Sequence, residues 1–437
     1  MIRAFMRLAM LASLGTLAFL LLDLPVSAEI RFIDPTPRAQ SDAADGSMAQ
    51  PWPSLAAAFA SDQIADGDSL QLLSGEYGEV IISKAVFKTP VTISPAKGAM
   101  VHLTGLKIDR SQNLSFHGLA IWPLGAGKGQ LVKTDRRSVG IVFQNLDIRS
   151  RVDADTYPSW SKDDWLSSRR GGILLGGPDN ALLDSHLTGL AFAIGAIGAR
   201  ARIEGNVVRG FSGDGARVLG DASVFSHNQI EDCVQVDKNH ADGFQSWSLG
   251  PDRRPGKGTV RGLKIENNSI REWANPILSP LRCSLQGIGM FDGMYEDVII
   301  RNNLVEVSAP HGITVAGGRR VVVTYNTVIN NRAVNRKFPW IAVVPHKNKT
   351  PSEDVVIANN IATIIRYIHD PGLRTTVSGN LTGMAPAQIF VDPARGDFRP
   401  RQGGPADGRA VPAFTLPTDL SGQPRGQNPD IGALESP

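Results

Sequence analysis

The sequence IENNSI, residues 265–270, decides the fold, because versions of it return along much of the chain. In each version an apolar residue and a variable residue precede a position that is usually Gly or Asn; Asn, a variable residue and another apolar residue follow. Asn and Gly tolerate the positive φ angles of tight turns, so the motif predicts a turn at the same point of every repeat. The other copies are IEGNVV (203–208), FSHNQI (225–230), IRNNLV (300–305), VTYNTV (323–328) and IANNIA (357–362).

The recurring asparagines give the length of the repeat. Their spacings are 22, 40, 35, 23, 34 and 20 residues, and the short spacings indicate a basic unit of about 20–23 residues, in the range of solenoid proteins. Asparagines that recur at a turn can stack and hydrogen-bond along the solenoid. The series consists of Asn206, Asn228, Asn268, Asn303, Asn326, Asn360 and Asn380.

A second strand, usually introduced by Gly, follows in each unit. These runs are short, bounded by glycine and unlike amphipathic helices. Together with the motif they predict an all-β chain in the form of a parallel β-helix, whose inward side chains stack coil on coil. The runs are GGILL (171–175), DGARV (214–218), DGFQSW (242–247), QGIGMF (286–291), HGITV (311–315) and PWIAVV (339–344).

The two ends of the chain suggest how the solenoid begins and ends. Residues 1–28 have a basic start, an apolar run and a small-residue cleavage site, which predicts a signal peptide and export. Residues 29–437 are expected to form one domain. Within it, residues 29–80 supply a capping helix and a first strand, residues 81–390 the coils, and residues 391–437 a Pro/Gly-rich closing segment.

This organisation resembles the right-handed parallel β-helix superfamily that includes pectate-lyase-like enzymes. The resemblance rests on the start DGS…PWPSLAAAF…DGD…LLSGEY, the Asn-marked coils and the ending DLSGQPRGQNPDIGALE. It implies a right-handed coil and a carbohydrate-active protein, since many members are polysaccharide lyases, glycoside hydrolases or uronate epimerases and others only bind. No complete catalytic signature of one subfamily is present.

Charge and composition narrow the class of partner. The formal charge of +3 falls to +2 without Arg3, Arg7 and Asp23, which argues against general nucleic-acid binding. Residues 232–350 carry 16 Lys/Arg against 10 Asp/Glu, which predicts a basic groove for an anionic polymer. We expect a periplasmic or secreted monomer that acts on an acidic polysaccharide, with no membrane span after signal cleavage. Export permits a disulfide between Cys233 and Cys283, although the sequence does not show whether they meet.

Extra residues in the longer coils predict where function lies. They precede or follow the second strand of several coils, so loops should border one row of strands on both sides, as function-bearing loops on a rigid scaffold do. These insertions are residues 151–170, 233–241, 249–259, 274–285, 332–339 and 345–352.

Alignment of the second strands predicts a column of side chains from successive coils. Neighbouring strands lie about 4.8 Å apart, so Asp214 and Asp242 should be near neighbours. The column contains Gly171, Asp214, Asp242, Gln286, His311 and Pro339. The remaining candidates lie beside it and are Arg169, Arg170, Arg217, Lys238, His240, Gln245, Trp247, Arg282 and Lys337.

Three hypotheses follow for these residues, and elimination at a uronate is the first choice. In a lyase, Lys238 or His240 would be the base and Arg282 or Arg217 would neutralise the substrate carboxylate. Asp214 and Asp242 would position the base or bind Ca²⁺, which is the one candidate cofactor.

Glycoside hydrolysis is the second hypothesis and binding without turnover is the third. In a hydrolase, Asp214 and Asp242 would be the acid and the base or nucleophile, and His311 would tune one of them. In a binding protein the same side chains would be contacts. The residues expected to bind substrate are Arg169, Arg170, Arg217, Gln245, Trp247, Gln286 and Lys337.

Overall fold

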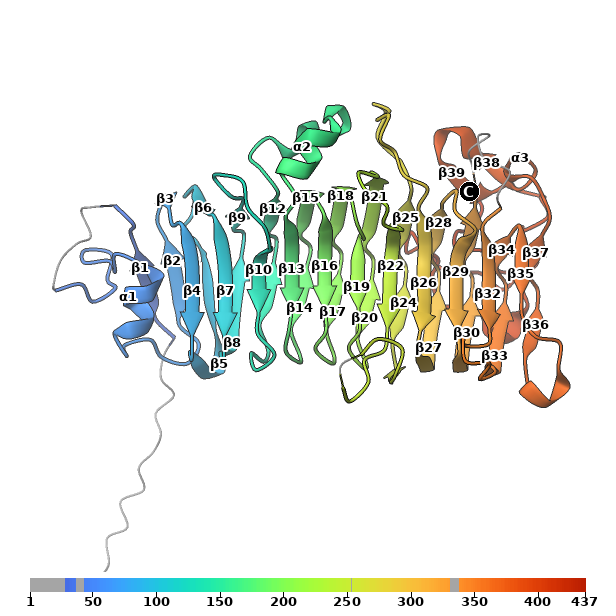
Figure 1. The fold of residues 1–437 in the computed structure, drawn as a ribbon, viewed down its shortest axis with the longest axis horizontal. Coiled ribbons are helices and arrows are strands. Elements are labelled where there is room, and N and C mark those ends of the chain that lie inside the picture. Colours follow the sequence, from blue (N-terminus) through green and yellow to red (C-terminus); the bar gives the residue numbers. More distant parts are fainter. Residues whose placement is uncertain (1–27, 37–42, 253, 331–337) are drawn as a thin grey trace, which may run out of the picture.

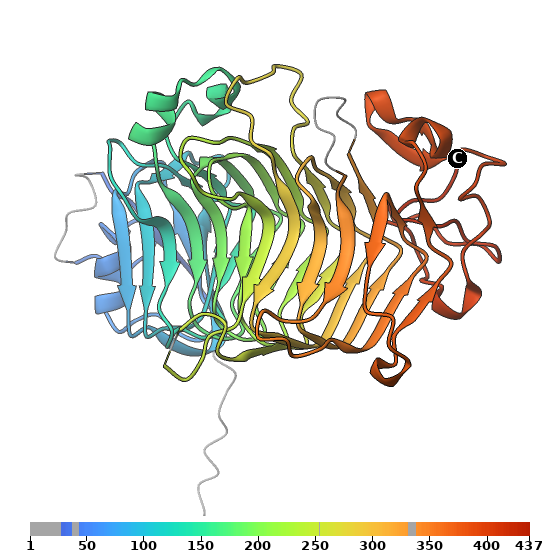
Figure 2. The ribbon, with the colours of Figure 1, turned by 45° about the vertical axis from the view of Figure 1, so that its right-hand side comes forward.

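A computed structural model of the chain describes residues 28–36, 43–252, 254–330 and 338–437. The predicted signal peptide, apart from Ala28, and residues 332–337 of one predicted insertion, which include the candidate Lys337, lie outside these residues. Three parallel sheets run side by side along the molecule and form a β-helix (Figures 1 and 2). Within the described residues, no helix is long and apolar enough to cross a bilayer.

We call the three sheets A, B and C, and each coil visits them in that order. Sheet A consists of β1 (Ile30–Ile33), β2 (Ser69–Leu72), β5 (Val86–Pro95), β8 (Gln112–His117), β11 (Val142–Gln144), β14 (Ala181–Leu183), β17 (Arg202–Glu204), β20 (Val224–Ser226), β23 (Thr259–Arg261), β24 (Lys264–Glu266), β27 (Met294–Arg301), β30 (Gly318–Thr324), β33 (Glu353–Ala358) and β36 (Thr376–Ser378). Sheet B consists of β3 (Gly75–Glu76), β6 (Val101–Leu103), β9 (Ala120–Ile121), β12 (Asp147–Arg149), β15 (His186–Leu190), β18 (Val207–Phe211), β21 (Gln229–Cys233), β25 (Ser269–Arg271), β28 (Leu304–Glu306), β31 (Thr327–Ile329), β34 (Ile361–Ala362) and β37 (Leu381–Thr382). Sheet C consists of β4 (Glu79–Ser83), β7 (Gly105–Asp109), β10 (Gln130–Thr134), β13 (Gly171–Leu175), β16 (Phe192–Ala196), β19 (Ala216–Val218), β22 (Asp242–Trp247), β26 (Gln286–Asp292), β29 (His311–Ala316), β32 (Trp340–Val344) and β35 (Ile364–Arg366).

The repeated motif contributes two strands to each coil. In IENNSI, β24 ends at Glu266 and β25 begins at Ser269, so Asn267 and Asn268 form the turn between sheets A and B. Asn267 has a φ angle of 55°, which explains why Gly or Asn is frequent at this position. A coil therefore has three strands: two come from the motif and one from the Gly-marked run. The sequence pattern suggests two, with one strand for the motif and one for the run.

A ladder of buried asparagines joins the coils at this turn. The Asn228 backbone N–H and the Asn228 Nδ2 both donate to Oδ1 of Asn268, at 3.0 Å each. The Asn268 Nδ2 in turn donates to the Phe225 carbonyl and to Oδ1 of Asn303, at 2.9 Å each. The same pattern of side-chain and backbone donation continues through Asn206, Asn228, Asn268, Asn303, Asn326, Asn360 and Asn380.

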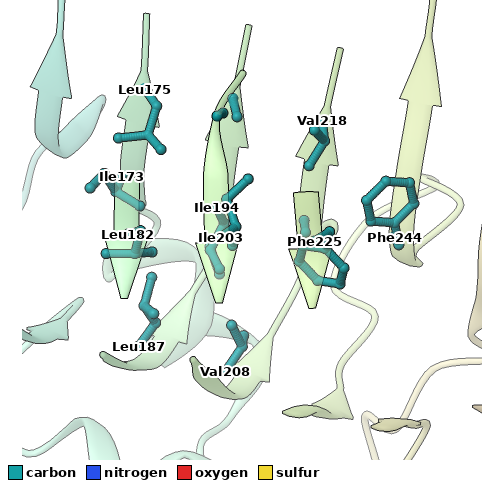
Figure 3. Close-up of a cluster of buried hydrophobic side chains, with 14 of the residues drawn as sticks. Ile173, Leu175, Leu182, Leu187, Ile194, Ile203, Val208, Val218, Phe225 and Phe244 are labelled. Atoms are coloured by element: carbon teal, nitrogen blue, oxygen red, sulfur yellow. The ribbon is translucent and has the colours of Figure 1, made fainter. Parts of the chain in front are cut away.

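The core fills the interior between the three sheets. Equivalent positions of successive coils stack on one another, as the register of Leu182, Ile203 and Phe225 in sheet A shows (Figure 3). Phe225 also packs against Phe244 of sheet C, with 4.9 Å between the ring centroids. These side chains are fully buried, so burial of apolar surface in every coil stabilises the stack.

The N-terminal end is covered by a helix, as expected. Helix α1 (Leu55–Ala60) begins after Ser54, whose hydroxyl accepts the N–H of Ala57 at 3.1 Å. Leu55 and Ala58 are buried in the main core.

The C-terminal segment packs on the outer face of sheet B along the last coils. It contains α3 (Pro386–Ile389) and the hairpin of β38 (Phe390–Asp392) and β39 (Asp397–Pro400). Phe390 and Phe398 form a second core with Leu304, Ile329 and Ile361, whose sequence neighbours Val305, Val328 and Ala362 face the interior.

Long loops flank the outer face of sheet C on both sides, as the insertions predict. One of the loops that enter sheet C carries α2 (Lys162–Ser167). In Figure 1 this helix lies above the ends at which the strands of sheet C begin. Residues 248–252 and 254–258 lie below the opposite ends of the sheet C strands in the same view. This arrangement leaves the outer face of sheet C as the bordered surface of the molecule.

The asparagine ladder predicts a large effect of one buried amide. Asn268→Ala should lower the free energy of unfolding by about 3 kcal/mol or more, because it leaves buried donors and acceptors of the adjacent coils without partners. Chemical denaturation followed by circular dichroism measures the change.

The control is Asn267→Gly in the same turn. Oδ1 of Asn267 makes no hydrogen bond among the described residues, and Gly adopts the positive φ angle freely. Equal destabilisation by both variants would contradict a special role of the ladder.

Candidate functional site

The strand register brings the predicted column together on sheet C. Asp242 lies opposite Gln286, and the pairing of β19 with β22 and of β26 with β29 extends the column to Asp214 and His311. Two members differ from the expectation. Phe192 lies between Gly171 and Asp214 in the column; the sequence alignment leaves it out because its coil lacks the Gly that marks the other strands. Trp340, rather than Pro339, lies opposite His311, where the register shifts.

Asp214 and Asp242, here called the carboxylate pair, are adjacent, buried and differently bound. Asp214 is 2% exposed; its Oδ1 accepts the Asp242 N–H at 3.0 Å and its Oδ2 pairs with Nε of Arg217 at 2.5 Å. Asp242 is 1% exposed, and its Oδ1 has no hydrogen-bond partner among the described residues. One carboxyl is therefore held by a cation and a backbone donor, whereas the other lacks both.

The pKa values follow from these surroundings. Burial raises the pKa of Asp242 to about 8; the charge of Asp214 also raises it, and Arg217 opposes the change. Burial raises the pKa of Asp214 too, against the direct ion pair with Arg217. Since the cation lies against Asp214, that carboxyl ionises first and the remaining proton stays on Asp242 near neutral pH.

A missing Cβ makes room for the Asp242 carboxyl. Gly289 lies opposite Gln245 in the next coil, and a Cβ placed there would lie 2.6 Å from Oδ1 of Asp242 and 2.5 Å from Cε2 of Phe291. The Phe291 ring and the carboxyl therefore share the space above Gly289.

Arg217 lies against two aromatic rings beside the carboxylate pair. Its guanidinium carbon lies 3.8 Å from the centroid of the Phe192 ring and 5.6 Å from that of Trp247. Gln245, the strand partner of Arg217, points outward as predicted and is half-buried.

The carboxylate pair does not fit calcium. Ca²⁺ takes six to eight oxygen ligands, whereas both oxygens of Asp214 are held by donors and Asp242 has a raised pKa. Among the residues that the structure describes, no group of three or more His, Cys, Asp or Glu side chains is placed to hold a metal. The residues present therefore support no step that involves a metal at this pair.

A basic hollow of about 650 Å³ lies next to the pair on the N-terminal side. Phe192 belongs to both, since it lines the hollow and contacts Arg217. Arg170 donates to the backbone carbonyls of Gly125 and Lys128, and the hydrogen-bond and ion-pair contacts of the described chain give it no carboxylate partner. The hollow is lined by residues 126–130, Leu166, Ser167, residues 169–171, Ala191 and Phe192.

Several predicted residues make no hydrogen bond or ion pair with the carboxylate pair among the described residues. Lys238 and His240 are exposed on the loop before β22, and within the described residues no hydrogen bond joins either side chain to Asp214 or Asp242. Arg282 is half-buried in the following loop, where it bridges to Val234. Their predicted roles as base and neutralising cation have no contact that supports them.

The three loops that enter sheet C here form one packed unit, which we call the loop wall and define as residues 150–170, 234–241 and 272–285. The loop wall has its own apolar cluster, made of Ala154, Tyr157, Trp160, Trp165, Val234, Val236 and Trp273 with Leu281 at its edge.

Polar and covalent contacts tie the same unit together. The Tyr157 hydroxyl donates to Asp232, whose other oxygen accepts the N–H of Ala274 at 2.6 Å. Arg169 pairs with Asp237 at 2.7 Å, so this candidate is partly neutralised. Cys233 and Cys283 form a disulfide, which answers the question that the sequence leaves open.

Part of the basic excess of residues 232–350 lies on sheet A rather than on sheet C. Arg261, Arg319 and Arg320 pair with Glu296 or Asp297 on the outer face of sheet A, because a stretch of this length visits all three sheets in turn. Arg217 beside the carboxylate pair and Arg170 in the adjacent hollow both precede residue 232 in the sequence.

Sequence reasoning missed three residues of this surface, namely Phe192, Phe291 and Arg366. Each faces outward from a strand of sheet C next to a predicted residue, and register alone could have placed them. A single sequence does not distinguish Phe192 and Phe291 from core residues, because aromatic residues in strands usually face the core. Arg366 belongs to no motif.

Comparisons with known proteins agree on the fold. A family model described as a right handed beta helix region matches residues 171–380. The chain is similar to the solved structure of the pectate lyase Pel9A, with a TM-score of 0.51 and 15% identity over 94% of this chain and 98% of that one.

Two further solved structures are more distant. The chain is similar to the PL6 family alginate lyase AlyGC (TM-score 0.43, 14% identity, 85% of this chain and 56% of that one). It is also similar to the GH136 lacto-N-biosidase from Eubacterium ramulus (TM-score 0.42, 11% identity, 82% of this chain and 68% of that one). No curated protein sequence matches the chain. At these identities the likeness concerns the fold.

The raised pKa of Asp242 predicts an unusual pH dependence of stability. The folded chain retains a proton between the ordinary carboxyl pKa of about 4 and the folded value of about 8, so wild-type stability should fall as the pH rises through this window. Asp242→Asn removes the ionisation and should raise the free energy of unfolding at pH 8 by an amount on the order of a few kcal/mol. Denaturant titrations at pH 5, 7 and 9 test this.

Asp237→Asn is the matched control on the neighbouring loop. The N–H of Asn239 and the ion pair with Arg169 lower the pKa of Asp237, so this variant should gain no stability at pH 8. A loss of stability in Asp242→Asn at every pH would contradict a protonated Asp242.

Proposed function

Because the chain is a right-handed parallel β-helix with two unlike carboxyls on its bordered sheet, we propose that it hydrolyses glycosidic bonds of an acidic polysaccharide. One observation carries this proposal: Asp242 is buried with an unpartnered oxygen beside Asp214, which is paired with Arg217, and this setting raises the pKa of Asp242 to about 8. Neighbouring carboxyls with pKa values pushed apart are the arrangement that supplies an acid and an anion for this reaction.

The two carboxyls take different roles. Asp242 donates its proton to the oxygen of the leaving sugar, which is the general-acid step. Asp214 stays ionised and stabilises the positive charge that develops on the other sugar. Water then forms the new bond to the anomeric carbon of that sugar, and the proton that the water loses returns to the Asp242 carboxylate, which restores the acid. The two oxygens of Asp214 are already held by Arg217 and by the Asp242 N–H, which makes Asp214 a fixed charge rather than a nucleophile.

The acidic character of the substrate is inferred from cations on both sides of the pair. Arg170 and Lys128 line the basic hollow, and Arg366 is exposed at the other end of sheet C. Guanidinium groups without a carboxylate partner suit sugar carboxylates, because their N–H groups match both oxygens.

Elimination, the first choice from the sequence, receives less support than hydrolysis. Its proposed bases, Lys238 and His240, are exposed and not oriented toward the pair by a hydrogen bond. Arg217, one of the two neutralising cations expected for a β-elimination, is engaged by Asp214 beside the pair.

We also propose that the protein acts outside the cytoplasm. The disulfide between Cys233 and Cys283 supports this, because such bonds persist in oxidising compartments. Together with the apolar start of the sequence, it points to the periplasm or the cell exterior.

Activity on defined polymers tests the reaction class. Purified protein should release reducing ends from at least one of polygalacturonate, alginate or hyaluronate, without the ultraviolet absorbance of an unsaturated uronate. Activity should decline as the pH rises through about 8, where Asp242 loses its proton.

Two variants supply the internal controls. Asp242→Asn should lower kcat by about 10²–10⁴-fold, the usual contribution of a general acid, while Asp237→Asn retains activity. New ultraviolet absorbance would show elimination instead, and binding without either product would show a binding protein. Either result would overturn the proposed hydrolysis.

A further inference from the structure

Four side chains gather on the outer face of sheet C beyond the carboxylate pair. Phe291, His311, Trp340 and Arg366 come from the successive strands β26, β29, β32 and β35. The His311 ring lies edge-on to Phe291 and to Trp340, with 4.9 Å between centroids in both cases. The guanidinium carbon of Arg366 lies 3.9 Å from the centroid of Trp340.

A chain of two hydrogen bonds reaches Nδ1 of His311. Nε1 of Trp340 is a donor without acceptor capacity, and it donates to Oγ1 of Thr314 at 3.1 Å. Oγ1 of Thr314 also lies 3.0 Å from Nδ1 of His311. Oγ1 of Thr314 can accept from Nε1 of Trp340 and donate its own proton to Nδ1; we assign this arrangement, in which the neutral ring carries its proton on Nε2.

His311 also stays neutral in this setting. Burial lowers the pKa of its ring, and the charge of Arg366 adds to the effect. Nε2 makes no hydrogen bond in the part of the chain that the structure describes, and the residue is half-exposed. Its N–H is therefore available to a ligand.

Arg366 supplies a second set of free donors. It is exposed, and no carboxylate of the described residues forms an ion pair with it. A guanidinium stacked on an indole keeps its N–H groups at the rim of the ring, where they can bind an anion in the plane of the stack.

Phe291 connects this group to the reaction centre. Its ring shares the space above Gly289 with the Asp242 carboxyl and meets His311 on the other side. His311 is two strands from Asp242 in the column, or about 10 Å along the sheet. A ligand here would be a part of the substrate other than the sugar that receives the proton.

We propose that Phe291, His311, Trp340 and Arg366 form a binding subsite for an acidic sugar residue of the substrate. The aromatic rings contact the sugar, Arg366 binds its carboxylate, and the Nε2–H of His311 donates to the carboxylate or a hydroxyl. This aromatic subsite rests on the proposed function. It adds that the C-terminal end of sheet C binds the charged sugar residues of the substrate.

Binding to a variant without turnover tests the aromatic subsite. In Asp242→Asn, titration calorimetry with hexameric oligogalacturonate, oligomannuronate and hyaluronate should detect binding of at least one of them. Adding Arg366→Gln should weaken that binding roughly tenfold to a hundredfold, the effect of losing a charge-assisted hydrogen bond. Arg374→Gln is the control, because Arg374 is already paired with Asp354.

The outcomes separate the two proposals. Binding that is unchanged by Arg366→Gln would overturn the aromatic subsite while the proposed hydrolysis stands. No binding of any acidic hexamer would overturn both. Hydrolysis of a neutral polymer alone would also remove the subsite, because no carboxylate would be selected.

A second measurement concerns the protein without ligand. Nitrogen-15 spectra of histidine-labelled protein at pH 7 should show His311 as neutral with the proton on Nε2, and Thr314→Val should abolish this preference. A charged His311, or a proton on Nδ1, would contradict the assigned arrangement and with it the donor assigned to the aromatic subsite.

Discussion

The hydrogen bond from one ladder asparagine to the next is the interaction on which the rest of the molecule depends. Each buried amide satisfies the backbone at a turn between sheets A and B and accepts from the coil before it. A slip of one residue would leave these groups buried without partners, which costs far more than a surface contact returns. The ladder therefore fixes the position of each coil on the next one. Because the same coil continues into sheet C, the ladder also fixes the register of that sheet.

That register has a chemical consequence on the outer face. It puts Asp214 and Asp242 on adjacent strands, where two carboxyls in a dry setting cannot both ionise without cost. Arg217 stabilises the charge of one of them, and the other keeps its proton. An unpartnered buried oxygen such as Oδ1 of Asp242 lowers stability, and it persists here because the surrounding coils hold it in place.

Much of the fold was predictable because the motif repeats. The turn asparagines, the Gly-marked strands and the adjacency of Asp214 and Asp242 follow from periodicity, and the capping helix follows from the local sequence at residues 54–60. The site was harder, because its members come from separate coils and their roles depend on exposure. Lys238 and His240 look catalytic by residue type, but the loop before β22 leaves them in solvent. Phe192 and Arg366 carry no motif, and only the strand pairing places them beside the others.

The central claim is that Asp242 is protonated at neutral pH while Asp214 is charged. Carbon-13 spectra of protein labelled at the aspartate carboxyls, assigned with Asp242→Asn and Asp214→Asn, measure both titrations directly. The account predicts that Asp242 titrates near pH 8 and that Asp214 is already ionised when it does. A carboxyl of Asp242 that titrates near pH 4, as in an exposed aspartate, would contradict the account.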